Sequence, residues 1–77
     1  MFLYSILDVK SRNFGSLAEC RTDDEAIRSF LIAIQKAPVG SLLHDFSVDF
    51  ALFKIGHFDT DTGYLTQEVQ HHIQPNQ

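Results

Sequence analysis

The chain has little of what stabilises many small proteins. Its 77 residues include a single cysteine, Cys20, and no tryptophan. One cysteine cannot form a disulfide within the chain, which argues against a stapled secreted scaffold. We expect Cys20 to be a small apolar residue near the core rather than a nucleophile. A chain of this length forms one domain with a marginal core, so self-association is expected as a source of stability.

Positive charge is also scarce, because six lysines and arginines stand against ten acidic residues and give a net charge of −4. This balance argues against a general binder of duplex DNA, whose affinity comes largely from cationic contacts to phosphates. It does not exclude nucleic acid if the few cations lie on one face. Long apolar runs are absent too, so neither a transmembrane helix nor a signal peptide is expected, and no membrane contact.

What the chain does contain predicts a small α+β domain with the element order β-α-β-β. Residues 2–9 are rich in β-forming side chains and too few for a stable helix, so they are expected to form a strand. A helix is expected over 23–36, with Thr22 as its cap and Glu25 completing a capping box. Pro38 prevents the helix from continuing much further.

The clearest local pattern is an antiparallel hairpin that closes the sheet. Its strands are expected at 50–58 and 64–69, around an aspartate-rich turn in which Gly63 adopts a positive φ. The domain is expected to span 1–70, followed by a flexible polar tail over 71–77.

The predicted helix is apolar around most of its circumference. Ile27, Leu31 and Ile34 belong to a stripe with helical spacing, whereas Ile32 falls outside that stripe. Such a helix is buried on more than one side, and a second copy of the chain would supply the extra cover. We therefore expect Ile32, together with Phe53 on the sheet, to lie at an interface between subunits.

The segment between the first strand and the helix holds Lys10, Arg12 and Phe14 within five residues, with Gly15 as a breaker. On local pattern alone a solvated loop with one anchoring aromatic is favoured. The sharper hypothesis is a mobile arm that pairs its cations with phosphates and stacks a base on Phe14.

Catalytic and metal-binding patterns are weak. The Asp59–Gly63 turn resembles the start of a calcium loop, but the twelfth position, which needs a bidentate glutamate, is Gln70. His44 and Asp45 are adjacent, with no nucleophile or orienting group in the pattern around them. Four apolar residues nearby are expected to pack at the core edge, namely Leu42, Leu43, Phe46 and Val48. No catalytic residue, metal site or cofactor is predicted, and the protein is not expected to be an enzyme.

Three segments together resemble the small non-structural proteins of gokushovirus-type single-stranded-DNA phages (Microviridae). They are YSILDVK at Tyr4–Lys10, EAIRSF at Glu25–Phe30 and DFALFKIGHFDTDTG at Asp49–Gly63. The chain departs from the family pattern at two prolines, one before the helix and one where Val48 stands. The resemblance implies a DNA-binding or replication-related protein, made in the cytoplasm of the infected bacterium and used in genome synthesis or packaging.

The sequence therefore leaves two functional hypotheses. The first, which the resemblance favours, is binding of single-stranded DNA, weak and sensitive to salt because of the acidic balance. Its expected contacts are the cations and candidate stacking residues Lys10, Arg12, Phe14, Arg21, Arg28, Lys54 and Tyr4. The alternative is a homo-oligomeric interaction module that docks on a replication, capsid or host protein, for which a basic partner would suit the acidic domain.

Overall fold

The computed structural model describes residues 1–73, excluding the side chains of residues 69 and 70, and has the predicted α+β fold. Its helix α1 (Asp23–Lys36) has the predicted bounds. A five-stranded antiparallel sheet has the order β2-β1-β4-β5, with β3 also paired to β1. The strands are β1 (Phe2–Asp8), β2 (Asn13–Phe14), β3 (Ala18–Cys20), β4 (Phe50–Phe58) and β5 (Leu65–Ile73).

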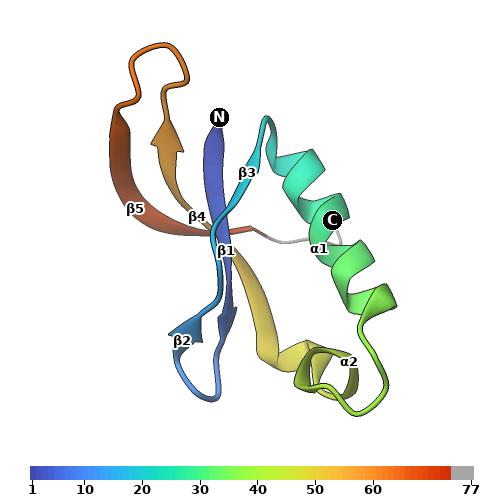
Figure 1. The fold of residues 1–77 in the computed structure, drawn as a ribbon. Coiled ribbons are helices and arrows are strands. Elements are labelled where there is room, and N and C mark those ends of the chain that lie inside the picture. Colours follow the sequence, from blue (N-terminus) through green and yellow to red (C-terminus); the bar gives the residue numbers. More distant parts are fainter. Residues whose placement is uncertain (74–77) are drawn as a thin grey trace.

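Strand β1 lies in the middle of the sheet (Figure 1). On one side it pairs with β4 along its whole length, from Phe2 opposite His57 to Asp8 opposite Phe50. On its other side it pairs with β2 and then with β3. Both ladders of β4 shift register around Ile55, so the sheet is irregular at that level.

The segment after β1 is part of the sheet and not a free arm. Phe14 lies opposite Leu7, and the Gly15 N–H donates to the Ile6 carbonyl at 2.9 Å. The Ser5 hydroxyl donates to the Gly15 carbonyl at 3.0 Å. This corrects the sharper hypothesis, the mobile arm. The pairing was not predicted because strands of two and three residues are too short to give a periodic pattern.

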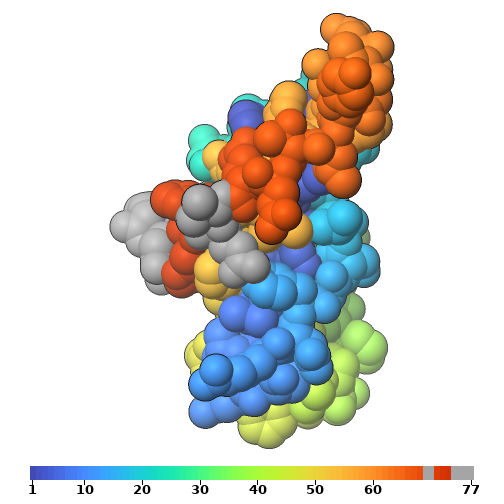
Figure 2. Space-filling model, turned by 90° about the vertical axis from the view of Figure 1, so that its left-hand side faces the viewer, coloured from blue at the N-terminus to red at the C-terminus, as the bar shows by residue number. Residues whose placement is uncertain are grey.

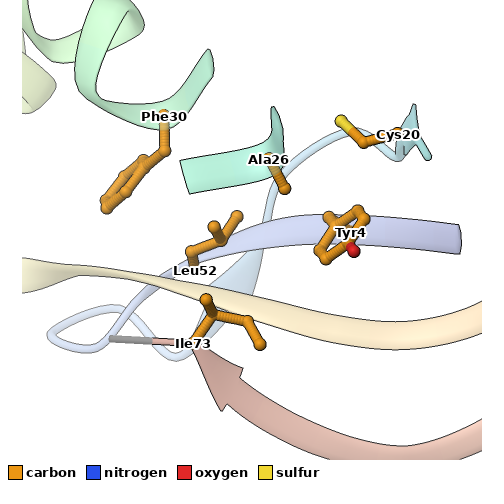
Figure 3. Close-up of a cluster of buried hydrophobic side chains, with 6 residues drawn as sticks. All are labelled: Tyr4, Cys20, Ala26, Phe30, Leu52 and Ile73. Atoms are coloured by element: carbon orange, nitrogen blue, oxygen red, sulfur yellow. The ribbon is translucent and has the colours of Figure 1, made fainter. Parts of the chain in front are cut away.

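Helix α1 packs on one face of the sheet and builds the core there. Thr22 Oγ1 accepts from the Glu25 N–H, and Glu25 Oε1 accepts from the Arg21 N–H, both at 3.1 Å, so the predicted capping box is present in a slightly shifted form. Figure 3 shows the core between helix and sheet, made of Tyr4, Cys20, Ala26, Phe30, Leu52 and Ile73. Cys20 was expected to be semi-buried and is buried in this core.

The segment between α1 and β4 is more ordered, and more exposed, than expected. It contains a short helix, α2 (Leu42–Asp45), and a turn of 3₁₀ helix (Ser47–Asp49). Phe46 and Val48 are 54% and 92% exposed, so they do not pack at the core edge. Ser41 caps α2, since its Oγ accepts from the His44 N–H at 3.2 Å.

The second strand of the hairpin is longer than predicted. It runs to Ile73 instead of Val69, because Ile73 is buried opposite Leu52 in the core. Residue 70, the expected end of the domain, therefore falls within β5. The rest of the expected tail, 74–77, lies outside the described residues.

Candidate nucleic-acid interface

The sheet face opposite α1, here called the open face, carries a row of aromatic side chains. Phe14 of β2 meets Phe53 of β4 edge-to-face, with ring centroids 5.7 Å apart and an interplanar angle of 82°. His72 of β5 stacks on the other side of Phe53, at 5.1 Å and 22°. The row thus crosses the sheet from one edge strand to the other.

Strand alternation explains why these rings gather. Ser5 lies opposite Phe53, which lies opposite His72, and directly paired residues share a face. Phe14 is 40% exposed and His72 is exposed at the other end of the row. An exposed aromatic surface of this kind offers stacking area to unpaired bases or to apolar and aromatic side chains.

A groove of about 340 Å³ adjoins the aromatic row on the side of the β4–β5 turn. Leu3 and Ser5 form its buried floor, while Phe14 and Leu17 wall it on one side and β5 on the other. Figure 2 looks onto this side of the molecule, with residues around 10–17 in blue shades and β5 in orange. Ile55, where the β4–β5 register shifts, also lines the groove.

Two of the predicted cations lie in the turn that precedes Phe14. The Asp8 carboxylate accepts from the Lys10 N–H at 3.0 Å, and the Asp8 carbonyl accepts from the Arg12 N–H at 2.7 Å. Arg12 adopts a positive φ of 63° that completes the turn. Both residues are exposed, so Lys10, Arg12 and Phe14 form a cationic and aromatic group at one edge of the sheet.

Tyr4 is not available for base stacking, which corrects its assignment to the site. Its ring is 1% exposed and lies beneath α1 in the core. The hydroxyl donates to Asp23 Oδ1 at 2.6 Å. Burial, followed by this hydrogen bond, raises the pKa of Tyr4. Tyr4 and Phe53 lie on opposite faces of the sheet, so they cannot form one platform.

Lys54 also points to the helix side and not to the open face. Its Nζ is 3.0 Å from Asp23 Oδ1 and 4.6 Å from the centre of the Phe2 ring. The hydrogen bond from Tyr4 and then the one from Lys54 lower the pKa of Asp23. The charge of Lys54 is therefore matched within the domain, so Lys54 does not extend the cationic group around Phe14.

The remaining predicted residues do not gather with the row. Arg21 follows β3 at the start of α1, and Arg28 is exposed on α1, which covers the other face. Ile32 is 42% exposed on α1, so the structure leaves this predicted interface residue uncovered. Phe53, the other predicted interface residue, belongs to the aromatic row, which places the two on opposite sides of the molecule.

One residue of the site was not predicted. His72 lies in the segment that was expected to be a tail. Only an extension of the predicted second hairpin strand through residue 73 would have placed it on the sheet.

The aspartate-rich turn is held by its own backbone. The Asp59 carboxylate accepts from the N–H groups of Asp61 and Thr62, which lowers the pKa of Asp59. Across residues 1–73 no group of three or more potential ligands is placed to hold a metal ion.

The fold and this site define a small α+β protein whose sheet is covered by a helix on one face and carries exposed aromatic side chains on the other. The chain belongs to the Phage ORF5 protein family, whose model matches residues 1–75. Over 65 aligned residues it is 37% identical to Protein ORF5 of Chlamydia phage 1. The aligned region covers 82% of this chain and 68% of that relative. No solved structure matches the chain.

The family assignment confirms the resemblance to gokushovirus-type phage proteins that the sequence motifs indicated. Within the described part of the chain, no helix has the length and apolar character needed to cross a bilayer.

Proposed function

We propose that this phage protein binds single-stranded DNA on its open face, without catalysing a reaction. The observation that carries the proposal is the row of Phe14, Phe53 and His72 across a sheet face that α1 leaves uncovered. Aromatic side chains on a sheet are a recurring platform for single-stranded nucleic acid, because every base has a face that can stack. Stacking of this kind contributes about 1–3 kcal/mol per base.

The turn before Phe14 supplies the matching electrostatics. Lys10 and Arg12 are exposed beside one end of the row, where they can meet the phosphates of a strand whose bases stack on the rings. Only two cations contribute, and the chain as a whole is acidic, so binding is weak and strongly dependent on salt. Genome replication or packaging in the cytoplasm of the host bacterium is the role that fits such a protein in a phage family.

The test is fluorescence anisotropy with a labelled oligothymidylate of about 12 nucleotides at several salt concentrations. Phe14→Ala should weaken binding about tenfold, as expected when one base can no longer stack. Tyr64→Ala is the matched control, because Tyr64 is 75% exposed but lies in the β4–β5 turn, outside the row. It should leave the affinity unchanged.

A charge test uses two double variants with equal net charge. Lys10→Glu with Arg12→Glu should weaken binding and reduce the log–log salt slope by about 0.7 for each phosphate that the protein no longer neutralises. Arg28→Glu with Lys36→Glu changes charge on α1, on the other side of the sheet, and should affect the slope much less. Equal effects of the two pairs, or no binding by the parent protein at low salt, would refute the proposal.

A second candidate function, self-association as an interaction module, is favoured by the outer surface of α1. Leu31 and Ile32 are 44% and 42% exposed there, beside the half-buried Ile27 and Ile34. Two adjacent aliphatic side chains exposed on one helix are typical of a surface that a second chain covers.

A further inference from the structure

The two ends of the open face differ in charge. Lys10 and Arg12 lie in the exposed turn between β1 and β2, where Asp8 and Asp49 border the hollow that Lys10 lines. At the other end, Glu68 lines the groove, and Glu19 of β3 lies directly opposite Leu3, which forms the groove floor. Because paired residues on neighbouring strands share a face, Glu19 stands beside the groove on the open side.

The groove between these two glutamates is apolar. Its walls include Leu17 and Leu65, which are 58% and 66% exposed, and the Phe14 ring at the border with the aromatic row. Aliphatic side chains exposed to this extent around a hollow of about 340 Å³ form a surface that gains free energy when an apolar group fills it.

The charge at the rim of the groove determines which class of ligand can place an apolar group in it. Glu19 and Glu68 are both exposed, and neither has an ion-pair partner among the residues that the structure describes. Two such carboxylates repel the phosphates that accompany every nucleotide, so the groove is unfavourable for the DNA strand proposed to lie on the aromatic row. They attract lysine and arginine side chains.

We infer that the groove binds an apolar and basic peptide segment of a protein partner. An aliphatic or aromatic side chain of the segment fills the groove, and lysine or arginine side chains on either side of it pair with Glu19 and Glu68. An arginine can also lie against the exposed Phe14 ring. The open face would then bind two kinds of ligand, with phosphates held by Lys10 and Arg12 in the β1–β2 turn and a basic polypeptide held by the two glutamates at the groove.

The experiment uses three fluorescein-labelled peptides of roughly ten residues, in which an extended backbone presents alternate side chains to the same side. The first alternates leucine and arginine, the second alternates serine and arginine, and the third alternates leucine and glutamate. The full-length protein should bind the first peptide and bind the other two at least about tenfold more weakly, because each lacks one of the two complementary properties.

Variants locate the binding site. Glu19→Gln with Glu68→Gln should weaken binding of the leucine–arginine peptide about five- to tenfold, since each exposed ion pair contributes up to about 1 kcal/mol. Leu17→Ala should weaken it several-fold without affecting the core, because Leu17 is largely exposed. Asp24→Asn with Asp45→Asn removes the same charge from exposed positions on α1 and α2, away from the groove, and should leave binding unchanged.

Three results would overturn the inference. The control pair could weaken binding as much as the groove pair, which would indicate a general attraction between a basic peptide and an acidic protein. The leucine–glutamate peptide could bind as well as the leucine–arginine peptide. Finally, Glu19→Gln with Glu68→Gln could leave peptide binding intact while strengthening oligothymidylate binding more than the control pair, which would assign the groove to nucleic acid. Loss of DNA binding alone would bear only on the proposed function.

Discussion

Asp23 connects the helix to the sheet more closely than any other polar residue described. It opens α1, accepts the Tyr4 hydroxyl from β1 at 2.6 Å and pairs with Lys54 of β4 at 3.0 Å. Its charge also suits the positive end of the helix dipole. One carboxylate thus fixes the position of the first turn of α1 relative to β1 and β4. The apolar contacts of the core nearby are less directional.

Replacing Tyr4 with phenylalanine tests this connection while preserving the ring in the core. The change removes the hydroxyl donor and should lower the free energy of unfolding by about 1 kcal/mol, a value reduced for the partial exposure of Asp23. The pKa of Asp23, followed by NMR, should rise, because the Tyr4 hydrogen bond is the largest cause of its lowering. Phe2→Tyr is the control, because it adds a hydroxyl on the same strand. It should not raise the pKa of Asp23.

The lowered pKa of Asp23 also predicts how stability depends on pH. A carboxylate whose pKa is lower in the folded state stabilises the protein above its unfolded pKa of about 3.9, and this contribution is lost as the pH falls through the folded value. Chemical unfolding between about pH 2 and pH 6 should therefore show stability falling with acid. Asp23→Asn should be less stable at neutral pH and have a shallower acid decline. An acid decline as steep as in the parent protein would contradict this assignment.

Among the elements, those with complete local signals were predicted well. The bounds of α1 were found because Thr22, Glu25 and Pro38 mark the two ends by short-range chemistry. Strand alternation in β1 and β4 places Tyr4 and Leu3, and likewise Leu52 and Phe53, on opposite faces of the sheet. Local patterns do not indicate which face the helix covers, and this is why Tyr4 and Lys54 were assigned to the site although they lie beneath α1.

Elements that depend on tertiary pairing were missed. β2 and β3 are ordered by β1, and the last residues of β5 by the burial of Ile73 opposite Leu52. His72 entered the site in the same way, because its position is defined only by pairing with Phe53. The Lys10, Arg12 and Phe14 group was predicted as a unit because its members are close in sequence.

The β4–β5 hairpin depends on a glycine whose role is steric. A Cβ atom on Gly56 would lie 2.7 Å from the Thr66 carbonyl oxygen, a distance that requires the two strands to move apart. Gly56→Ala should therefore destabilise the protein by about 1–3 kcal/mol, as overpacking does elsewhere. Gly15→Ala is the control, because its Cβ would lie 3.6 Å from the Ile6 carbonyl oxygen, an ordinary contact. Equal stability of the two variants in urea unfolding would argue against the close approach.

At the scale of the whole molecule, the exposed helix surface predicts association. Sedimentation over a dilution series should give a mass above that of the monomer at high concentration, since α1 exposes both Leu31 and Ile32. Leu31→Glu with Ile32→Glu should give a monomer that keeps its helical circular dichroism. Leu42→Glu, at a 62% exposed position on α2, is the control and should leave the association unchanged. A parent protein that is monomeric at high concentration would contradict the proposed interaction surface.

The central position of β1 has a consequence for the order of folding. β1 precedes the other elements of the domain in the chain, but its longest partner, β4, begins only at Phe50, after α1 and α2. β1 with β2 and β3, and β4 with β5, are pairings between neighbours in the chain, whereas joining β1 to β4 closes a loop that contains the helix. Because that closure costs entropy before any contact compensates for it, we expect the meeting of β1 and β4 to limit the folding rate. Nascent chains that end before Phe58 cannot complete the sheet.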